Sequence, residues 1–178
     1  MEKYKDKEAN VYLRPITIDD TELIVSWRNK ESVRKNFIYQ APFSIEGHMN
    51  WMHNVIETGK AVQMMICRID NDNPIGSVYI RDIDDLHKKG EFGIFIGDDE
   101  ARGKGVGTAT AKLMVSYAFN QLSLHRLYLR ALAENKRAIR SYEKAGFIQE
   151  GCLQDDVCIN GEYKDIVWMA IVKKETVR

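Results

Sequence analysis

The stretch EFGIFIGDDEARGKGVGT, residues 91–108, decides the fold because it joins an alternating strand, a glycine-rich turn and the start of a helix. In the expected strand at 91–97, one face carries Phe92, Ile94 and Ile96, and the other carries Glu91, Gly93 and Phe95. Because glycine has no Cβ, the backbone N–H groups at 103–107 can approach a ligand closely, and at a helix N-terminus they form an anion site. The pattern therefore predicts that a pyrophosphate-bearing ligand binds here, in preference to a turn that merely starts a helix.

Two common phosphate-binding motifs do not fit this stretch. A Walker A loop would need glycine where Asp98 stands and serine or threonine where Gly105 follows Lys104. The dinucleotide fingerprint spaces its glycines as G-x-G-x-x-G, whereas this chain has G-x-G-x-G, and the end of the next expected strand offers Arg130 in place of a ribose-binding acid. Nucleoside triphosphate loops and nicotinamide dinucleotides are therefore disfavoured.

The rest of the chain predicts one mixed α/β domain over residues 1–178. Hydrophobic periodicity indicates strands at 11–16, 61–69, 75–80, 91–97, 124–131, 147–153 and 163–172. Helices are expected at 19–27, at 29–37, after Ser44 as N-cap, from the glycine loop to about Gln121, and at 135–145. No repeat or Pro/Gly-rich linker divides the sequence, and the order of elements is neither cleanly alternating nor segregated.

Composition bounds the function. Twenty-six basic residues balance 26 acidic ones, so the chain as a whole has no electrostatic footprint for nucleic acid. No apolar run approaches the roughly 20 residues of a membrane helix, and the polar N-terminus does not resemble a signal peptide. Cys67, Cys152 and Cys158 suit reduced thiols, and the histidine and cysteine spacings predict no metal site. We expect a cytoplasmic protein without nucleic-acid or membrane partners.

Three segments together resemble the GNAT superfamily of N-acetyltransferases. They are the Arg-x-x-Gly-x-Gly pattern at 102–107, the stretch ENKRAIRSYEKAGF at 134–147, and GEYKD at 161–165 before an apolar strand. The resemblance covers about residues 14–170, and its C-terminal part is closest to the branch of ribosomal-protein and spermidine acetyltransferases. The combination is specific, although the first pattern alone is weak.

The resemblance implies a mixed, twisted sheet of about seven strands flanked by helices, with splayed fourth and fifth strands at 91–97 and 124–131. It also implies acetyl-CoA as cosubstrate, whose pantetheine arm pairs with backbone in the splay and whose pyrophosphate meets the glycine loop. A backbone N–H freed by a bulge would polarise the thioester carbonyl. The cofactor-binding residues that it implies are Ile94, Phe95, Ile96, Arg102, Gly103, Lys104, Gly105, Val106, Gly107, Thr108 and Asn135.

Two side chains are the expected catalytic groups. By the resemblance, Tyr142 protonates the departing thiolate; it lies seven positions after Asn135, on nearly the same helix face, and Asn135 is also a fitting N-cap. Glu91 is the first candidate for accepting the proton of the amine, through water. An exposed edge glutamate is an equally good interpretation of Glu91, and the alternative bases are Asp82, Asp84 and Asp85 in the preceding loop.

The acceptor stays open at this level. Segments at 27–34 and 43–51 resemble amino-sugar-nucleotide acetyltransferases of the pseudaminic acid pathway, so Arg28 and Arg34 are candidates for binding substrate phosphate, against a solvated basic helix face. We predict an acetyl-CoA-dependent N-acetyltransferase whose primary amine, from a polyamine, an amino-sugar nucleotide or a protein N-terminus, attacks directly. The alternative is a non-catalytic acetyl-CoA sensor or interaction module, and a homodimer is a further possibility.

Overall fold

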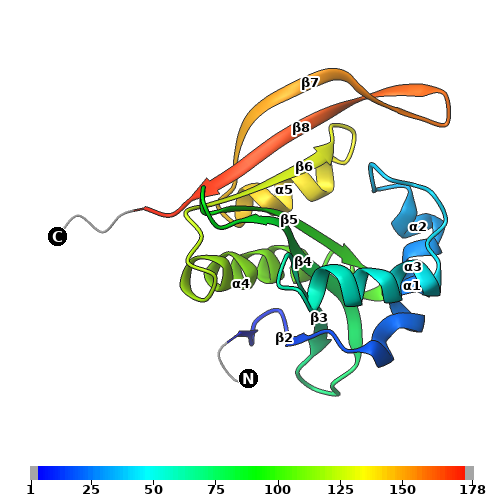
Figure 1. Ribbon diagram of the computed structural model, residues 1–178, viewed down its shortest axis with the longest axis vertical. Helices are drawn as coiled ribbons and strands as arrows, with labels where there is room; N and C mark the ends of the chain where they lie inside the picture. Colours follow the sequence, from blue (N-terminus) through cyan, green and yellow to red (C-terminus); the bar gives the residue numbers. More distant parts are fainter. Residues whose placement is uncertain (1–3, 175–178) are drawn as a thin grey trace.

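An eight-stranded mixed sheet runs through the computed structural model, which describes residues 4–174 (Figure 1). The strands are β1 (Lys5–Asp6), β2 (Val11–Pro15), β3 (Val62–Arg68), β4 (Pro74–Asp84), β5 (Lys89–Ile96), β6 (Arg126–Leu132), β7 (Ile148–Ile159) and β8 (Glu162–Val172). Their order is β1-β2-β3-β4-β5-β6-β8-β7, and only β5 and β6 pair in parallel. The helical segments are η1 (Ile18–Asp20), α1 (Thr21–Asn29), α2 (Glu31–Arg34), α3 (Ile45–Trp51), η2 (Met52–Ile56), η3 (Asp99–Ala101), α4 (Val106–Asn120) and α5 (Lys136–Lys144).

The expected fold class is confirmed, with differences in detail. All seven expected strands are present, and the eighth is the two-residue β1, which is too short to show an alternating pattern. β7 runs well past residue 153 because it pairs with β8 in a hairpin closed by Asn160 and Gly161, both at positive φ. The helix expected at 29–37 is wrong in extent, since α1 continues to Asn29 and α2 has only four residues. Ser44 caps α3 as predicted and accepts a hydrogen bond from Gly47 N.

The two faces of β5 belong to two hydrophobic clusters. Phe92 packs with Met114 of α4 and with Phe147, whereas Phe95 packs with Trp27 of α1 and Val33 of α2. The alternation of strand side chains produces this division, as the sequence predicted for residues 91–97. Figure 1 shows α1, α2 and α3 gathered together, away from α4 and α5. β5 therefore separates two differently built halves of the molecule.

β5 and β6 part soon after they begin to pair. Their parallel register covers only Lys89↔Arg126, Gly90↔Leu127 and Glu91↔Tyr128. Beyond this point β5 stays on β4 as far as Ile96, and β6 stays on β8 as far as Leu132. Every second residue of a strand directs its N–H and C=O to the same side, so residues 92–96 leave backbone groups facing the gap without a strand partner. The predicted splay is confirmed.

Three negative observations apply to the part of the chain that the structure describes. No helix between residues 4 and 174 is long and apolar enough to cross a membrane. Over the same residues, no group of three or more His, Cys, Asp or Glu side chains is placed to hold a metal ion. Cys67 is buried, Cys152 and Cys158 are exposed, and all three are free thiols.

The packing at Gly97 generates a stability prediction. A Cβ at Gly97 would lie 2.1 Å from Cδ2 of the buried Trp27, whereas a Cβ at Gly151 would meet nothing within 4 Å. We expect Gly97→Ala to lower the free energy of unfolding by about 1–3 kcal/mol through overpacking, and Gly151→Ala to be neutral or slightly stabilising. Urea unfolding of both variants measures this. Equal effects in the two variants would contradict the packing argument.

Candidate active site

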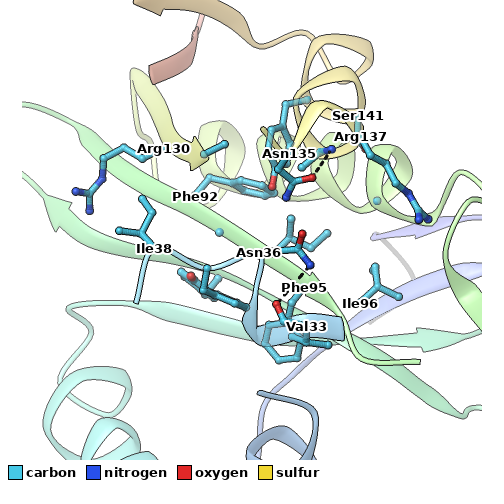
Figure 2. A pocket seen from close by; sticks show the side chains of 18 of the residues that line it. Val33, Asn36, Ile38, Phe92, Phe95, Ile96, Arg130, Asn135, Arg137 and Ser141 are labelled. Carbon is cyan, nitrogen blue, oxygen red and sulfur yellow. Dashed lines mark hydrogen bonds between the residues drawn. The ribbon is translucent and has the colours of Figure 1, made fainter. Parts of the chain in front are cut away.

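A cavity of about 1100 Å³ lies where β5 and β6 separate. Figure 2 shows it between two groups of side chains, with β5 passing through it. One group comes from α2 and the following segment and is labelled at Val33, Asn36 and Ile38. The other comes from β6, α5 and the loop between them and is labelled at Arg130, Asn135, Arg137 and Ser141. The labelled residues of β5 are Phe92, Phe95 and Ile96. The cavity therefore reaches both faces of the sheet through the gap between the strands.

The glycine loop presents unpaired backbone donors to this cavity. Gly103 and Gly105 adopt φ of 82° and 81°, and Gly105 is the N-cap of α4. Within residues 4–174, no backbone N–H from Gly103 to Thr108 donates a hydrogen bond to a protein acceptor, and the first i→i−4 bond of the helix runs from Ala109 N to Gly105 O. Such donors at the positive end of a 15-residue helix form an anion site.

A cationic face of α5 adds to this anion site. Arg137, Arg140 and Lys144 line the cavity, and none of them makes an ion pair with another residue of the described chain. Nη2 of Arg137 lies 3.6 Å from the position that a Cβ of Gly103 would take. Sequence reasoning missed these residues, although their spacing of three, four and seven places them on one helix face. The α5 cations and the α4 N-terminus converge on the same space.

The expected cofactor residues divide by position. Ile94, Phe95, Ile96, Arg102, Gly103, Gly105, Gly107, Thr108 and Asn135 line the cavity, whereas Lys104 and Val106 do not. The Arg102 guanidinium donates to the carbonyl oxygen of Ile96 at 2.8 and 3.2 Å and pairs with Asp99 at 2.5 Å, so it fixes the loop to the end of β5. Thr108 Oγ1 lies 2.9 Å from Ser141 Oγ and thereby joins α4 to α5.

Tyr142 projects from α5 into the cavity. Its ring packs edge-on against Phe92 and Phe147, at centroid distances of 5.9 and 6.2 Å. Burial raises the pKa of Tyr142, and the nearby Tyr79 acts in the same direction, so the phenol keeps its proton at neutral pH. Asn135, on the same side of the helix, caps α5 by accepting a hydrogen bond from Ala138 N at 3.2 Å. The predicted cap is confirmed, and the side chain also reaches the cavity.

Glu91 lies at the point where the strands part. Glu91 is not the exposed edge residue considered from sequence, because only 7% of its side chain is accessible. Arg81, its cross-strand neighbour on β4, donates from Nη2 at 3.0 Å, and Arg130 of β6 donates from Nε at 3.0 Å. Arg130 lies two residues beyond Tyr128, the last β6 residue that pairs with β5. The carboxylate thus joins three strands where the backbone pairing of β5 with β6 ends.

Of the alternative acids, only Asp82 lines the cavity, and it pairs with Arg81 at 3.6 Å. Asp84, the last residue of β4, accepts a hydrogen bond from His87 N, and Asp85 in the following turn pairs with Lys88, so both hold the turn between β4 and β5. Their residue type and spacing did not distinguish them from Asp82. The positive φ of Asp82 and the register shift between Arg81 and Asp84 form a bulge, which changes the direction of the side chains in this segment.

The half of the cavity beside α1 contains an aromatic and basic group. Tyr79 lies over Gly93, where a Cβ would meet its ring carbons at 2.2 and 2.4 Å, so glycine is required there. Arg28 lines the cavity, with its guanidinium carbon 3.4 Å from the centroid of the Phe37 ring. Arg34 is not among the residues that line it. Sequence reasoning missed Tyr79 and Arg81 because only the β4–β5 register places them opposite Gly93 and Glu91.

Comparison with known proteins gives one family. The family model of the acetyltransferase (GNAT) domain matches residues 10–148. Spermidine N(1)-acetyltransferase of Escherichia coli K12 is 30% identical over 93% of this chain and 88% of its own length. The L-amino acid N-acetyltransferase AaaT of the same organism is 32% identical over 71% of this chain and 76% of its own length. A crystal structure of spermidine N-acetyltransferase from Vibrio cholerae in complex with CoA and spermine superposes with a TM-score of 0.85, at 27% identity, covering 92% of this chain and 96% of that one.

Proposed function

This chain belongs to the GNAT acetyltransferases and is an acetyl-CoA-dependent N-acetyltransferase, and from that premise we propose how its residues carry out the transfer. The observation that carries the proposal is the splay of β5 and β6, because it joins an anion site on one face of the sheet to a polar pocket on the other. We propose that the acceptor amine enters from the α1 side and attacks directly, without a covalent enzyme intermediate.

The cavity has the features that acetyl-CoA requires. The N–H groups from Gly103 to Thr108 and the guanidinium of Arg137 are placed to bind phosphate. Alternate residues of β5 from 92 to 96 offer backbone groups to an amide-bearing arm in the splay, apart from the carbonyl oxygen of Ile96, which Arg102 already binds. When bound, acetyl-CoA supplies an activated acetyl thioester. A free β5 N–H facing the gap is positioned to stabilise negative charge on the acetyl oxygen.

Proton movement is assigned to two side chains on opposite sides of β5. We propose that Tyr142 Oη holds the proton that the leaving sulfur takes up, since this phenol lines the cavity and is protonated at neutral pH. We propose that Glu91 receives the amine proton. The transfer goes through water and not by direct contact, because both carboxylate oxygens already accept hydrogen bonds from guanidinium groups. Asp82, the other carboxylate in the cavity, is the alternative acceptor of this proton.

Substrate and context complete the proposal. The named relatives act on spermidine and on L-amino acids, so their names span a polycationic and a zwitterionic class of amine. We propose that the acceptor is a small-molecule amine. Amino-sugar nucleotides and protein N-termini belong in the same activity screen. The binding role of Arg34, the single-domain organisation, the cytoplasmic location and the homodimer expected from the sequence stay predictions.

The first prediction concerns the glycine loop. Gly105→Val should abolish stabilisation by CoA, because the side chain would occupy the space above the unpaired N–H groups. In the wild type, CoA at about 100 times its Kd should add roughly 2.7 kcal/mol to the free energy of unfolding. Thermal unfolding with and without CoA measures the difference. Gly105→Asn is the control for backbone strain, because asparagine tolerates the positive φ of this position. It should also lose the stabilisation by CoA. Full stabilisation by CoA in either folded variant would refute the placement of the pyrophosphate at the glycine loop.

A second prediction isolates the proton donor. Tyr142→Phe should lower kcat about 10²- to 10⁴-fold and leave the Kd for CoA nearly unchanged, since only the hydroxyl is removed and the ring still packs on Phe92. Steady-state thiol release and calorimetric CoA binding give the two quantities. A wild-type kcat in this variant would remove Tyr142 from the chemistry.

A third prediction tests the proton acceptor by its pH dependence. Activity of Glu91→Gln should fall at neutral pH and recover as pH rises, because more of the amine is then deprotonated without assistance. Asp82→Asn, in the same cavity, should keep the wild-type pH profile. If Glu91→Gln loses activity equally at every pH, the role of Glu91 is to hold Arg81 and Arg130 in place. If only Asp82→Asn loses activity at neutral pH and regains it as pH rises, Asp82 is the base.

A further inference from the structure

Arg28 is a half-buried cation with no carboxylate partner among residues 4–174. Its Nη1 is buried and has no hydrogen-bond partner there, and its guanidinium carbon lies over the rings of Phe37 and Phe43, at 3.4 and 5.3 Å from their centroids. Burial lowers the pKa of Arg28; Tyr79 opposes this effect, and the like charge of Arg81 adds to it. A buried charge without a counter-ion is unfavourable, so its presence in a cavity indicates that a ligand supplies the opposite charge.

The carboxylates nearby are already engaged. Glu91 accepts hydrogen bonds from both Arg81 and Arg130, and Asp82 pairs with Arg81. Lys35 also lines this half of the cavity and makes no ion pair with the described residues. Four cationic side chains therefore face two carboxylates, and neither carboxylate is paired with Arg28. The surplus charge around the acceptor half is positive.

The basic group lies beside the route to the reacting centre. Tyr79 is the cross-strand neighbour of Gly93, on the same face of the sheet as Arg81 and Glu91. Arg28, Arg81 and Arg130 line the cavity together with Tyr79. Burial raises the pKa of Tyr79, the charges of Arg81, Arg28 and Arg130 oppose that rise, and Glu91 adds to it. Tyr79 and Tyr142 both line the cavity. A ligand group held by these arginines is thus next to the opening through which an amine must reach Tyr142.

We propose that the acceptor is a small primary amine that also carries an anionic group, a carboxylate or a phosphate, and that this group binds to Arg28 and Arg81. The proposal rests on the function proposed above and names the substrate class of that site. Guanidinium groups bind both anions through paired N–H donors, so the two sources share one recognition chemistry. A polyamine has the opposite charge, and in this half of the cavity it would meet arginines that repel it.

Matched acceptor pairs test the inference. L-alanine and L-methionine are compared with their amides, glucosamine 6-phosphate with glucosamine, and spermidine stands as the polycation. Wild-type kcat/KM should be at least about 10-fold higher for the anionic member of one pair, and that pair identifies the source of the anion. In Arg28→Met the ratio should fall towards one, with Arg81 still contributing, whereas Arg68→Met, at an arginine outside the cavity that pairs with Asp70, should keep the wild-type ratio. The two members of a pair have different amine pKa values, which affect kcat/KM in every enzyme. This effect cancels when the ratio of the pair in a variant is compared with the ratio in the wild type.

A stability measurement separates ligand binding from a structural role. Because Arg28 has no counter-ion, Arg28→Met should raise the Tm of the free protein by about 2–4 °C and leave the Kd for CoA unchanged. A structural arginine would instead give a lower Tm on replacement. Arg68→Met should leave the Tm nearly unchanged or slightly reduced, since surface pairs contribute little.

Two results would overturn the inference. The first is spermidine as the best acceptor, with kcat/KM ratios in Arg28→Met equal to those of the wild type. The second is a lower Tm in Arg28→Met together with unchanged acceptor ratios. Failure of the proposed function has a different signature, since no amine in the panel would then release thiol from acetyl-CoA.

Discussion

The hydrogen bonds that Glu91 accepts from Arg81 and Arg130 lie where β5 and β6 stop pairing. When two strands of one sheet separate, their facing backbone groups need other partners, in the protein, in water or in a ligand. Here Arg81 of β4 and Arg130 of β6 bind one carboxylate at the start of the gap, and their side chains bridge the strands where the ladder ends. The gap that follows exposes the backbone of residues 92–96 to the cavity.

The alternation of β5 gives the two ends of the cavity different chemistry. On the side of Phe92, the cavity meets the N-terminus of α4, the cationic face of α5 and the half-buried phenol of Tyr142. On the side of Phe95, it meets Tyr79, Arg28 and the carboxylate network. The first end suits a phosphorylated cofactor and the second a polar acceptor, and the reaction requires the two to meet in the gap. Fold and mechanism therefore depend on the same few residues of β5.

Local patterns predicted the parts of this arrangement that are contiguous in sequence. The alternation at 91–97, the glycine loop, the Asn135 cap and the position of Tyr142 on its helix all follow from spacing within one segment. Residues brought together by strand register were missed, because the pairing of Arg81 with Glu91 and of Tyr79 with Gly93 is set by a bulged hairpin. The full surroundings of Glu91 also need Arg130, which lies 39 positions away in the chain. Motif resemblance supplied the splay, which hydrophobic periodicity alone does not predict.

Amide hydrogen exchange with and without CoA tests most directly the claim that the cofactor binds in the splay. The account predicts added protection in two places: at alternate amides of residues 92–96, which lack a strand partner, and at the amides of Gly103 to Thr108. Amides of α1 and α2 should change little, since they border the acceptor end. Protection of the glycine loop without any change in β5 would contradict the account, because the cofactor would then bind to the helix N-terminus and leave the gap between the strands empty.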